Sequence, residues 1–524
     1  MATKAFGRGI LWGVCLVVHV ASGAGISRPD IRTVVIDHVP AATQIYLGSP
    51  SIVIMPNGSY VASHDYFGPG SSEDTTGVFR SEDRGQTWRK IAVIKGQFWS
   101  TLFIHRKQLF LLGTSRRFGH IVIRRSTDGG ATWTSPASAN SGRLTSENHY
   151  HCAPTPVIEY QGRLWRAFED TRRAANGGQS FQALVVSTPA DADLLTAANW
   201  TLSSPLPGNT GWLGGKFDGW LEGNAVVDRS GRLLDILRVR FTSGPEKAAF
   251  VQVSPDGSPL AFDPTTGFHD FPGGAKKFTI RFDRQTRLYW TLANTIPEPK
   301  PPGRIDLIRN TLTLNNSPDL VHWTERAVLL HHPDPKFHAF QYVDWQFDGA
   351  DIIAAVRTAN DDASGGAHNG HDANYFTFLR VAGFRDLKAG LPEPAASFET
   401  RDLSISGSGF TIDTLSNGQT AFSNRKYIWQ GIPEKYSGWR YTKTAGGSRS
   451  TIRVRAKHDA ILQMITATEQ PGADLTGWER TGVEFRYSDE HHTKMVLCLK
   501  PMASGKEVEI PQGNWTGSLV LFPD

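Results

Sequence analysis

The chain has 524 residues, enough for one large and one small domain, each with its own core. Aromatic residues make up 10% of it, and its 52 glycines suit many short strands joined by turns. The formal net charge is only +5, and the lysines and arginines are scattered, without a basic block or zinc-finger spacing, so nucleic-acid binding is not indicated. A mildly basic surface equally suits an acidic sugar.

The first residues have the features of a secretory signal peptide. Lys4 and Arg8 precede an apolar run from Ile10 to Ala21, and small residues follow as far as Ala24. This run is too short to span a bilayer, and the sequence has no later run of about 18 apolar residues. We therefore expect residues 1–24 to be removed and the rest to be secreted, extracellular and free of membrane contacts. Four N-glycosylation sequons would mark surface positions in a eukaryotic protein: Asn57, Asn199, Asn315 and Asn514.

One eight-residue pattern occurs twice, as Ser81–Trp88 and Ser126–Trp133, with weaker copies at residues 254–257 and 317–323. Each strong copy follows an apolar run, which predicts a strand, a tight turn with Asp and Gly, and a Trp that begins the next strand. Repetition at this spacing indicates stacked supersecondary units. The pattern resembles the Asp box of sialidase-like β-propellers, in which Asp83 and Asp128 would brace turns between the third and fourth strands of a blade.

The same unit can be followed six times between residues 49 and 384, which predicts an all-β fold with a β-propeller. Ile31–Val39 is a candidate for the strand that closes the ring. Six units can be counted directly, and a seventh could be assembled from this strand and the segment after Leu387. A linker with Pro and Gly at residues 388–394 leads to further short strands. We expect a propeller over residues 25–390 and a C-terminal β-sandwich over residues 395–524, which either supports the propeller or binds sugar.

Cys152 and Cys498 are the two cysteines that remain after the signal peptide. In an oxidising compartment they could form one disulfide that ties the two domains together. Two unpaired buried thiols are an equal alternative.

A propeller usually binds its ligand in a funnel at the centre of one face, lined by strand ends and loops. Several second strands of the predicted units end in or carry polar side chains. Arginines that converge there would bind a carboxylate through paired hydrogen bonds, although any one of them could instead form a structural salt bridge. These polar residues are His64, Asp65, Arg116, Arg117, Arg166, Glu169, Arg238, Asn294 and Arg357.

Histidines supply the candidates for proton transfer. His105 ends a predicted first strand, and a polar loop before the third unit contains Tyr150 and His151. A second His-rich loop contains His368 and His371. Their spacing would suit a metal, but no third or fourth ligand is evident.

The Asp-box propeller, Tyr150 followed sixteen residues later by Arg166, the loop around His371 and the sandwich tail together resemble secreted propeller polysaccharide lyases. The ulvan lyases belong to these, and the nearest family is that of the fungal L-rhamnose-α-1,4-D-glucuronate lyases. That family has a seven-bladed propeller, a catalytic His that acts as base and acid, and a calcium ion near the propeller axis. The resemblance implies β-elimination that removes rhamnose caps from gum arabic-type arabinogalactan side chains.

By this resemblance His105 takes the role of the catalytic His, and Tyr150 and Arg166 match the Tyr and Arg of the ulvan lyases. No organic cofactor is expected, and the resemblance implies a calcium ion and an acidic polysaccharide substrate. We expect a monomer. The candidate calcium ligands, near the axial ends of first strands, are Glu222, Asn224 and Asp344. The expected substrate-binding residues are His64, Arg116, His151, Arg238, Arg357 and His371.

The chemistry of this reaction is consistent with these residue types. Removing the C5 proton of a 4-linked glucuronate requires that the neighbouring carboxylate is neutralised. Arg166, with Arg238 or Arg357, would supply that charge, and His105 would be the base. The O4 leaving group would receive its proton from His105 or Tyr150.

Two other classes stay open. An exo-sialidase-like glycoside hydrolase shares the Asp boxes and the arginine cluster, but the expected Phe/Tyr-Arg-Ile-Pro motif is absent from residues 26–32, and no Tyr–Glu nucleophile pair can be identified. In a secreted carbohydrate-binding propeller, His105 and Tyr150 would have no special role. An unsaturated uronate product would distinguish the lyase from both, and release of free sugar would separate the hydrolase from the lectin.

Overall fold

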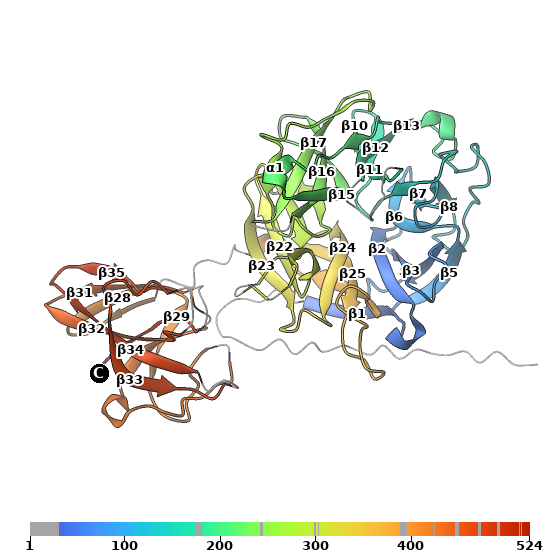
Figure 1. Ribbon diagram of the computed structural model, residues 1–524. Coiled ribbons are helices and arrows are strands. Elements are labelled where there is room, and N and C mark those ends of the chain that lie inside the picture. Colours follow the sequence, from blue (N-terminus) through green and yellow to red (C-terminus); the bar gives the residue numbers. More distant parts are fainter. Residues whose placement is uncertain are drawn as a thin grey trace, which may run out of the picture. The chain divides into compact units, whose positions relative to one another are not determined.

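The computed structural model describes residues 31–523 except 173–180, 242–244, 298–299, 302, 388–395, 424, 446–449, 470–472, 490–492, 513 and 515. The expected signal peptide and linker therefore lie outside the described residues. The described chain divides near residue 390 into two compact units (Figure 1). None of the described residues belongs to a helix that is long and apolar enough to cross a membrane.

The first unit is a β-propeller, and its described residues form six antiparallel sheets arranged as a ring of blades (Figure 1). Blade 1 consists of β2 (Tyr46–Ile54), β3 (Tyr60–Phe67), β4 (Thr75–Ser81) and β5 (Arg89–Lys95). Blade 2 consists of β6 (Phe98–His105), β7 (Gln108–Thr114) and β8 (Ile121–Ser126). Blade 3 consists of β9 (Tyr150–His151), β10 (Ile158–Tyr160), β11 (Arg163–Asp170), β12 (Gln182–Pro189), β13 (Thr201–Leu202) and β14 (Leu206–Pro207).

The other three blades complete the ring. Blade 4 consists of β15 (Phe217–Val227), β16 (Leu233–Phe241), β17 (Lys247–Val253), β18 (Leu260–Ala261) and β19 (Phe268–Asp270). Blade 5 consists of β20 (Thr279–Asp283), β21 (Leu288–Ala293), β22 (Thr311–Ser317) and β23 (Thr324–His331). Blade 6 consists of β24 (Ala339–Asp348), β25 (Asp351–Ala359), β26 (Tyr375–Val381) and the N-terminal strand β1 (Ile31–His38). Helical turns in this unit are α1 (Trp212–Gly215), η1 (Ala41–Thr43), η2 (Ala197–Asn199), η3 (Ile305–Leu307) and η4 (Phe384–Asp386).

The ring is closed by the two ends of the unit. Strand β1 pairs antiparallel with β26 as the outer strand of blade 6, which confirms the closing strand predicted from the sequence. The resemblance implied a seventh blade, and this prediction is wrong for the described chain, whose first unit has six sheets. Strand β1 already belongs to blade 6, and the strands after residue 395 belong to the second unit. Neither segment is therefore left to form a seventh blade.

The Asp boxes are turns held by their own side chains. The Ser81 hydroxyl donates to Asp83 at 2.8 Å and accepts the Gly85 amide at 2.8 Å. Asp83 also accepts the amide of Thr87 at 2.9 Å and its hydroxyl at 2.5 Å. Gly85 has φ +90°, and a Cβ there would collide with the ring of Phe378.

The tryptophans of the Asp boxes pack into the apolar layers between blades. Trp88 Nε1 donates to Gly85 O at 3.2 Å, and Trp133 Nε1 donates to Gly130 O at 2.8 Å, so the two tryptophans hold equivalent positions. Trp88 lies against Phe378 of blade 6, and Trp133 lies against the cluster that joins blades 1 and 2. The core is therefore a series of apolar layers, each shared by two neighbouring sheets.

The second unit is a β-sandwich. One sheet consists of β27 (Ala396–Glu399), β28 (Leu403–Ser408), β31 (Thr451–Ala456) and β35 (Glu507–Glu509). The other consists of β29 (Phe410–Thr414), β30 (Arg440–Thr444), β36 (Leu519–Phe522), β32 (Ala460–Thr466), β34 (Lys494–Met502) and β33 (Glu479–Arg486), and η5 (Glu434–Tyr436) lies before β30. Alternating residues of both sheets, such as Ile405, Val454 and Met464, form one apolar core.

The two cysteines are not paired. Cys152 and Cys498 are free thiols, and each is buried in the core of its own unit. Cys152 donates to the Trp99 carbonyl at 3.1 Å, and burial raises the pKa of its thiol to about 12. The alternative of a bridge between the domains is therefore wrong, because both sulfurs would have to leave apolar cores.

Two of the four sequons are also buried. Asn57 lies in an exposed turn, whereas Asn315 and Asn514 are 1% and 2% exposed and donate to threonine hydroxyls at 2.9 Å. Asn315 and Asn514 therefore do not mark surface, in contrast to the expectation from the sequence.

The Asp-box turn generates a stability prediction. Asp83→Ala removes the acceptor of several turn hydrogen bonds, so it should lower the free energy of unfolding of the propeller by about 1–3 kcal/mol. The matched control is Glu82→Ala, which removes the ion pairs of this exposed carboxylate with Arg80 and Arg89 and should cost at most about 1 kcal/mol. Denaturant unfolding of the three proteins measures both effects. Equal losses for the two variants would contradict this account of the turn.

Candidate functional site

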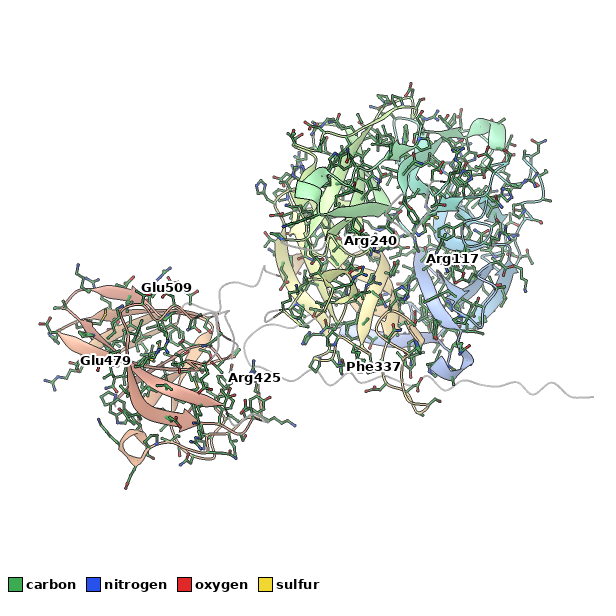
Figure 2. All side chains as sticks on the ribbon, in the orientation of Figure 1. Arg117, Arg240, Phe337, Arg425, Glu479 and Glu509 are labelled. Carbon is green, nitrogen blue, oxygen red and sulfur yellow. The ribbon has the colours of Figure 1, made fainter. Side chains whose placement is uncertain are left out.

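The strand register defines two ends of the propeller. In blade 2, His105 ends β6 at the β6–β7 hairpin, and Leu109 at the start of β7 pairs with Ser126 of the second Asp box. We call this the Asp-box end. First strands begin and second strands finish at the opposite end, which we call the site end. Figure 2 labels two arginines of the site end. Arg117 lies in the loop just after the second strand β7, and Arg240 lies near the end of the second strand β16.

Four first strands contain the same bulge near the site end. The pairing register of β2, β6, β15 and β24 shifts there, and a non-glycine residue in each shifted segment has a left-handed φ. These residues are Ser49 (49°), Trp99 (48°), Glu222 (60°) and Tyr342 (56°). A bulge redirects the side chain that it carries, and backbone strain of this kind is common at functional sites.

Glu222 and Tyr342, from the bulges of blades 4 and 6, contact each other. The Tyr342 hydroxyl donates to Glu222 Oε1 at 2.7 Å. Arg238 Nη1 donates to Glu222 Oε2 at 2.6 Å and lies 3.4 Å from the Tyr342 hydroxyl. Burial would raise the pKa of Glu222, but the Arg238 charge, helped by His151 and by the hydrogen bonds, lowers it to about 2. Glu222 is therefore an ionised carboxylate bonded to a phenol.

Two further arginines flank the ring of Tyr342. The guanidinium carbons of Arg309 and Arg357 lie 5.4 Å and 4.9 Å from the ring centroid. Arg309 donates to Gln341 Oε1 at 2.5 Å and to the Asp306 carbonyl at 2.8 Å, and Arg357 donates to the His371 carbonyl. All of these acceptors are uncharged groups.

The cluster is thus rich in buried positive charge. Arg238, Arg309 and Arg357 have 3% or 4% of their surfaces exposed, and among the described residues only Arg238 of the three donates to a carboxylate. Burial lowers the pKa of Arg309, and it lowers that of Arg357 to about 10, since desolvation disfavours an uncompensated charge. Buried cations that donate no hydrogen bond to a carboxylate favour binding of an anion, and planar guanidinium groups favour a carboxylate.

Gly48 in blade 1 has no side chain, and this leaves space for Phe67 and Arg357. A Cβ on Gly48 of β2 would lie 3.0 Å from the Phe67 ring and 4.0 Å from Arg357 Nη1. The Arg357 guanidinium lies over that same Phe67 ring, 4.5 Å from its centroid. A larger side chain at position 48 would therefore displace Phe67 and disturb Arg357.

His151 and Glu169 form a second pair at the site end. His151 Nδ1 lies 2.6 Å from Glu169 Oε2, and the ring packs against Trp99 and Phe181 with centroid distances of 4.4 Å and 5.0 Å. The other oxygen of Glu169 accepts the Glu222 amide at 2.6 Å. The same carboxylate therefore joins His151 to the bulge that carries Glu222.

Several sequence-predicted residues lie at the site end, in different roles. Arg238, Arg357 and His151 are brought together with Glu222 and Tyr342. His371 lies beside this group, with its ring 5.7 Å from the Phe67 ring and Nδ1 2.7 Å from Asp372. Tyr150 packs in the apolar layer between blades 2 and 3, and the charges of Asp170, Arg172 and Glu147 act on its phenol. The Arg116 side chain is exposed in the loop after β7.

Three predicted residues do not belong to the site. His105 lies at the Asp-box end, where its Nε2 is 2.7 Å from the Ala190 carbonyl, so it cannot act with the arginines of the site end. Arg166 is fully buried in the middle of β11 and donates to the Leu112 and Ala153 carbonyls. His64 is buried among aromatic rings and bonded to Asp37 at 3.0 Å. In the described structure, the hydrogen bonds of these three side chains go to groups other than Glu222, Tyr342 and the three arginines.

The calcium ligands implied by the resemblance do not fit that ion. Glu222 is bonded to Arg238, and Asp344 is bonded to Arg281 at 3.1 Å and to the Ser51 hydroxyl at 2.9 Å. The oxygen of Asn224 accepts the Ile280 amide at 3.1 Å. Within the described ranges, no three His, Cys, Asp or Glu side chains gather as metal ligands.

A buried lysine also lies in this region. Lys277 Nζ donates to the Val343 carbonyl and the Thr279 hydroxyl, both at 2.6 Å. Burial lowers the pKa of Lys277 to about 7, while the charges of Asp344 and Glu222 oppose this shift. The carboxylates assigned to calcium are therefore balanced by side-chain cations.

Sequence reasoning missed Tyr342 and Arg309 and assigned Glu222 to a metal. The sequence does contain a signal for the bulged positions. Each bulged residue lies two positions before a polar residue of the same first strand. The four pairs are Ser49 and Ser51, Trp99 and Thr101, Glu222 and Asn224, and Tyr342 and Asp344. Arg309 lies just before β22, the third strand of its blade. It was missed because the arginines were predicted from second strands only.

None of the known protein-family models and no curated protein sequence matches the chain. Among solved structures, an α-L-arabinanase of Penicillium chrysogenum complexed with arabinobiose is 14% identical, with a TM-score of 0.43 over 68% of this chain and 98% of that one. The Trypanosoma rangeli sialidase is 13% identical, with a TM-score of 0.45 over 94% of this chain and 89% of that one. The GH93 α-L-arabinofuranosidase of Fusarium graminearum is 12% identical, with a TM-score of 0.40 over 68% and 97%. These neighbours are carbohydrate-active enzymes, and at these identities the likeness concerns the fold alone.

The Glu222–Arg238 pair generates a prediction about acid stability. The pKa of Glu222 in the folded protein, about 2, is below its ordinary value of 4.5. The carboxylate therefore stabilises the fold above about pH 4.5, and this contribution is lost as the pH falls toward 2. Glu222→Gln should be less stable than the wild type at about pH 6, and the difference should shrink by about pH 3. Denaturant unfolding across this range measures it. A difference that does not change with pH would contradict the ionised state of Glu222.

Proposed function

We propose that the protein is a secreted, exo-acting glycoside hydrolase that removes a terminal sugar acid from a glycan. The observation that carries the proposal is the 2.7 Å hydrogen bond from the Tyr342 phenol to Glu222, with three buried arginines around it. Tyr342 and Glu222 are thus candidates for the Tyr–Glu nucleophile pair that the sequence did not reveal. The pair favours the hydrolase over a carbohydrate-binding propeller, because binding alone does not require a phenol that is hydrogen-bonded to a buried carboxylate.

The arginines would hold the substrate. Arg309 and Arg357 flank the phenol and have uncharged acceptors, so a carboxylate placed between them gains charge-assisted hydrogen bonds. Arg238 keeps Glu222 ionised and lies within reach of the Tyr342 hydroxyl. The reacting carbon of the substrate would then lie close to both its own carboxylate and the phenol oxygen.

Tyr342 would act as the nucleophile. Glu222 takes the phenol proton as the oxygen bonds to the anomeric carbon, and the bond to the leaving oxygen breaks. Water then releases the sugar from the glycosyl-tyrosine, and the phenol recovers its proton from Glu222. Two displacements at one carbon retain its configuration.

A phenol suits a substrate whose carboxylate is attached to the anomeric carbon, as in sialic acids. A carboxylate nucleophile would be repelled by that group, whereas a neutral phenol approaches it without charge repulsion. We therefore assign the substrate to the terminal 2-keto sugar acids.

The first test is cleavage of 4-methylumbelliferyl N-acetyl-α-neuraminide. The wild type should release the fluorophore, and Tyr342→Phe should lower the rate by about 10²–10⁴-fold because the nucleophile is lost. The control is Tyr160→Phe, at the Asp-box end, whose exposed hydroxyl donates to the Gly231 carbonyl and should not affect the rate. Wild-type activity in Tyr342→Phe would contradict the proposal.

The arginines are tested by Arg309→Gln, which keeps a polar side chain and removes the charge. It should lower kcat/KM by at least about 30-fold, since a buried charge partner of the substrate is lost. Binding of the unsaturated analogue 2,3-dehydro-N-acetylneuraminic acid should weaken in parallel. Unchanged binding of this analogue would mean that the carboxylate is held elsewhere.

A rhamnose-α-1,4-glucuronate lyase is the second candidate, because the same arginines would neutralise the carboxylate of a uronate. Tyr342 beside Glu222 would then remove the C5 proton, in place of His105. Incubation with gum arabic distinguishes the two candidates. Rhamnose that appears together with far-ultraviolet absorbance of an unsaturated uronate supports the lyase, and rhamnose without that absorbance indicates hydrolysis.

A further inference from the structure

His151 and Glu169 have no part in the steps described so far, yet the first displacement lacks a proton donor for the leaving oxygen. Glu169 is fully buried, and His151 is 8% exposed. Both belong to blade 3, in the paired strands β9 and β11, where His151 faces Glu169 in the register.

The Glu169 carboxylate fixes the histidine relative to the Tyr–Glu pair. Its Oε2 lies 2.6 Å from His151 Nδ1, and its Oε1 accepts the amides of Glu222 at 2.6 Å and Gly223 at 3.2 Å. The ring of His151 and the backbone of Glu222 are therefore held by the same carboxylate group. The proximity also appears in the electrostatics, because the His151 charge helps to lower the pKa of Glu222.

The contact with Glu169 also determines which nitrogen is available. Nδ1 donates to the carboxylate, so Nε2 carries the proton that can be exchanged. Nε2 has no hydrogen-bond partner within the described chain, and it is not among the buried polar atoms that lack one, so solvent reaches it. A group that needs no protein partner and stays accessible suits proton exchange with a ligand.

Aromatic side chains surround the ring on its other sides. Trp99, in the bulge of β6, makes an edge contact at 4.4 Å, and Phe118 and Phe181 lie at 6.4 Å and 5.0 Å between centroids. Apolar walls limit the water around Nε2 and offer flat surfaces on which a sugar ring can stack. They therefore favour a leaving-group sugar at this position.

We propose that His151, positioned by Glu169, is the general acid and base of the reaction; this inference rests on the proposed hydrolase. In the first step Nε2–H protonates the leaving oxygen as its bond to the anomeric carbon breaks. In the second step the neutral Nε2 takes a proton from the water that attacks the glycosyl-tyrosine, which restores the starting state. Glu169 stays ionised and stabilises the imidazolium in both steps.

The test compares two leaving groups. A general acid matters for the poor leaving group of 3′-sialyllactose and little for 4-methylumbelliferone, which leaves without a proton. His151→Ala should lower kcat/KM for 3′-sialyllactose by at least about 10²-fold and for the 4-methylumbelliferyl glycoside by less than about 10-fold. The matched control is His149→Ala, two residues away, whose ring lies near Glu147 and Asp170 and should not affect either rate.

The outcomes separate the inference from the proposed function. A wild type that cleaves both substrates, with equal losses in His151→Ala, would overturn the role of His151 and leave the hydrolase intact. A wild type that cleaves neither would overturn the hydrolase, and the inference with it.

Glu169→Gln tests the positioning role through the pH profile. The ionisable groups that face the ring are Glu169 from β11 and Glu222 from β15. Without the Glu169 charge the imidazolium is less stable, so the alkaline limb of kcat/KM should move to lower pH, whereas a purely structural role would lower the rate at all pH values alike. Thermal unfolding confirms that the variant is folded, and an unmoved limb in a folded variant would overturn the positioning role.

Discussion

The ion pair between Glu222 and Arg238 is the contact on which the rest of the site depends. Three guanidinium groups lie at the site end of the propeller with almost no exposed surface. Burying a charge is costly unless it is paired, and Glu222 pairs with only one of the three. The other two keep their charge among backbone carbonyls and a side-chain amide, which is a weaker compensation. The site is therefore stable enough to form and still favours an incoming anion.

The propeller supplies this site by repeating one local irregularity. Each of four first strands bulges near the site end, and the bulges of blades 4 and 6 bring Glu222 and Tyr342 into contact. The bulged residues are a serine, a tryptophan, a glutamate and a tyrosine, so the backbone repeats while the chemistry differs. The apolar layers between blades hold the six sheets firmly, which allows residues 120 positions apart, Glu222 and Tyr342, to meet within 2.7 Å. A rigid ring with variable side chains is well suited to a site that is assembled from several blades.

Much of the fold could be predicted from the sequence, because it depends on short-range patterns. The Asp boxes hold themselves together with hydrogen bonds between residues two to four positions apart, so an eight-residue pattern that occurs twice was enough to indicate the turns. The site was predictable only in part. Arg238 and Arg357 were found because second strands run toward the site end, but the same rule places the last residue of a first strand, His105, at the other end. The Tyr342–Glu222 pair depends on two bulges and on closure of the ring, which no local pattern contains.

The most direct measurement of the central claim is a covalent trap of the nucleophile. A 2,3-difluoro derivative of N-acetylneuraminic acid forms the first covalent bond and releases it slowly, because the fluorine at C3 destabilises the positive charge that develops at the anomeric carbon. Peptide mapping by mass spectrometry after incubation should find the sugar attached to Tyr342, and the attachment should disappear in Glu222→Gln. A glycan-cleaving wild type that yields no adduct, or an adduct on another residue, would contradict the assignment of Tyr342 and Glu222 as the reacting pair.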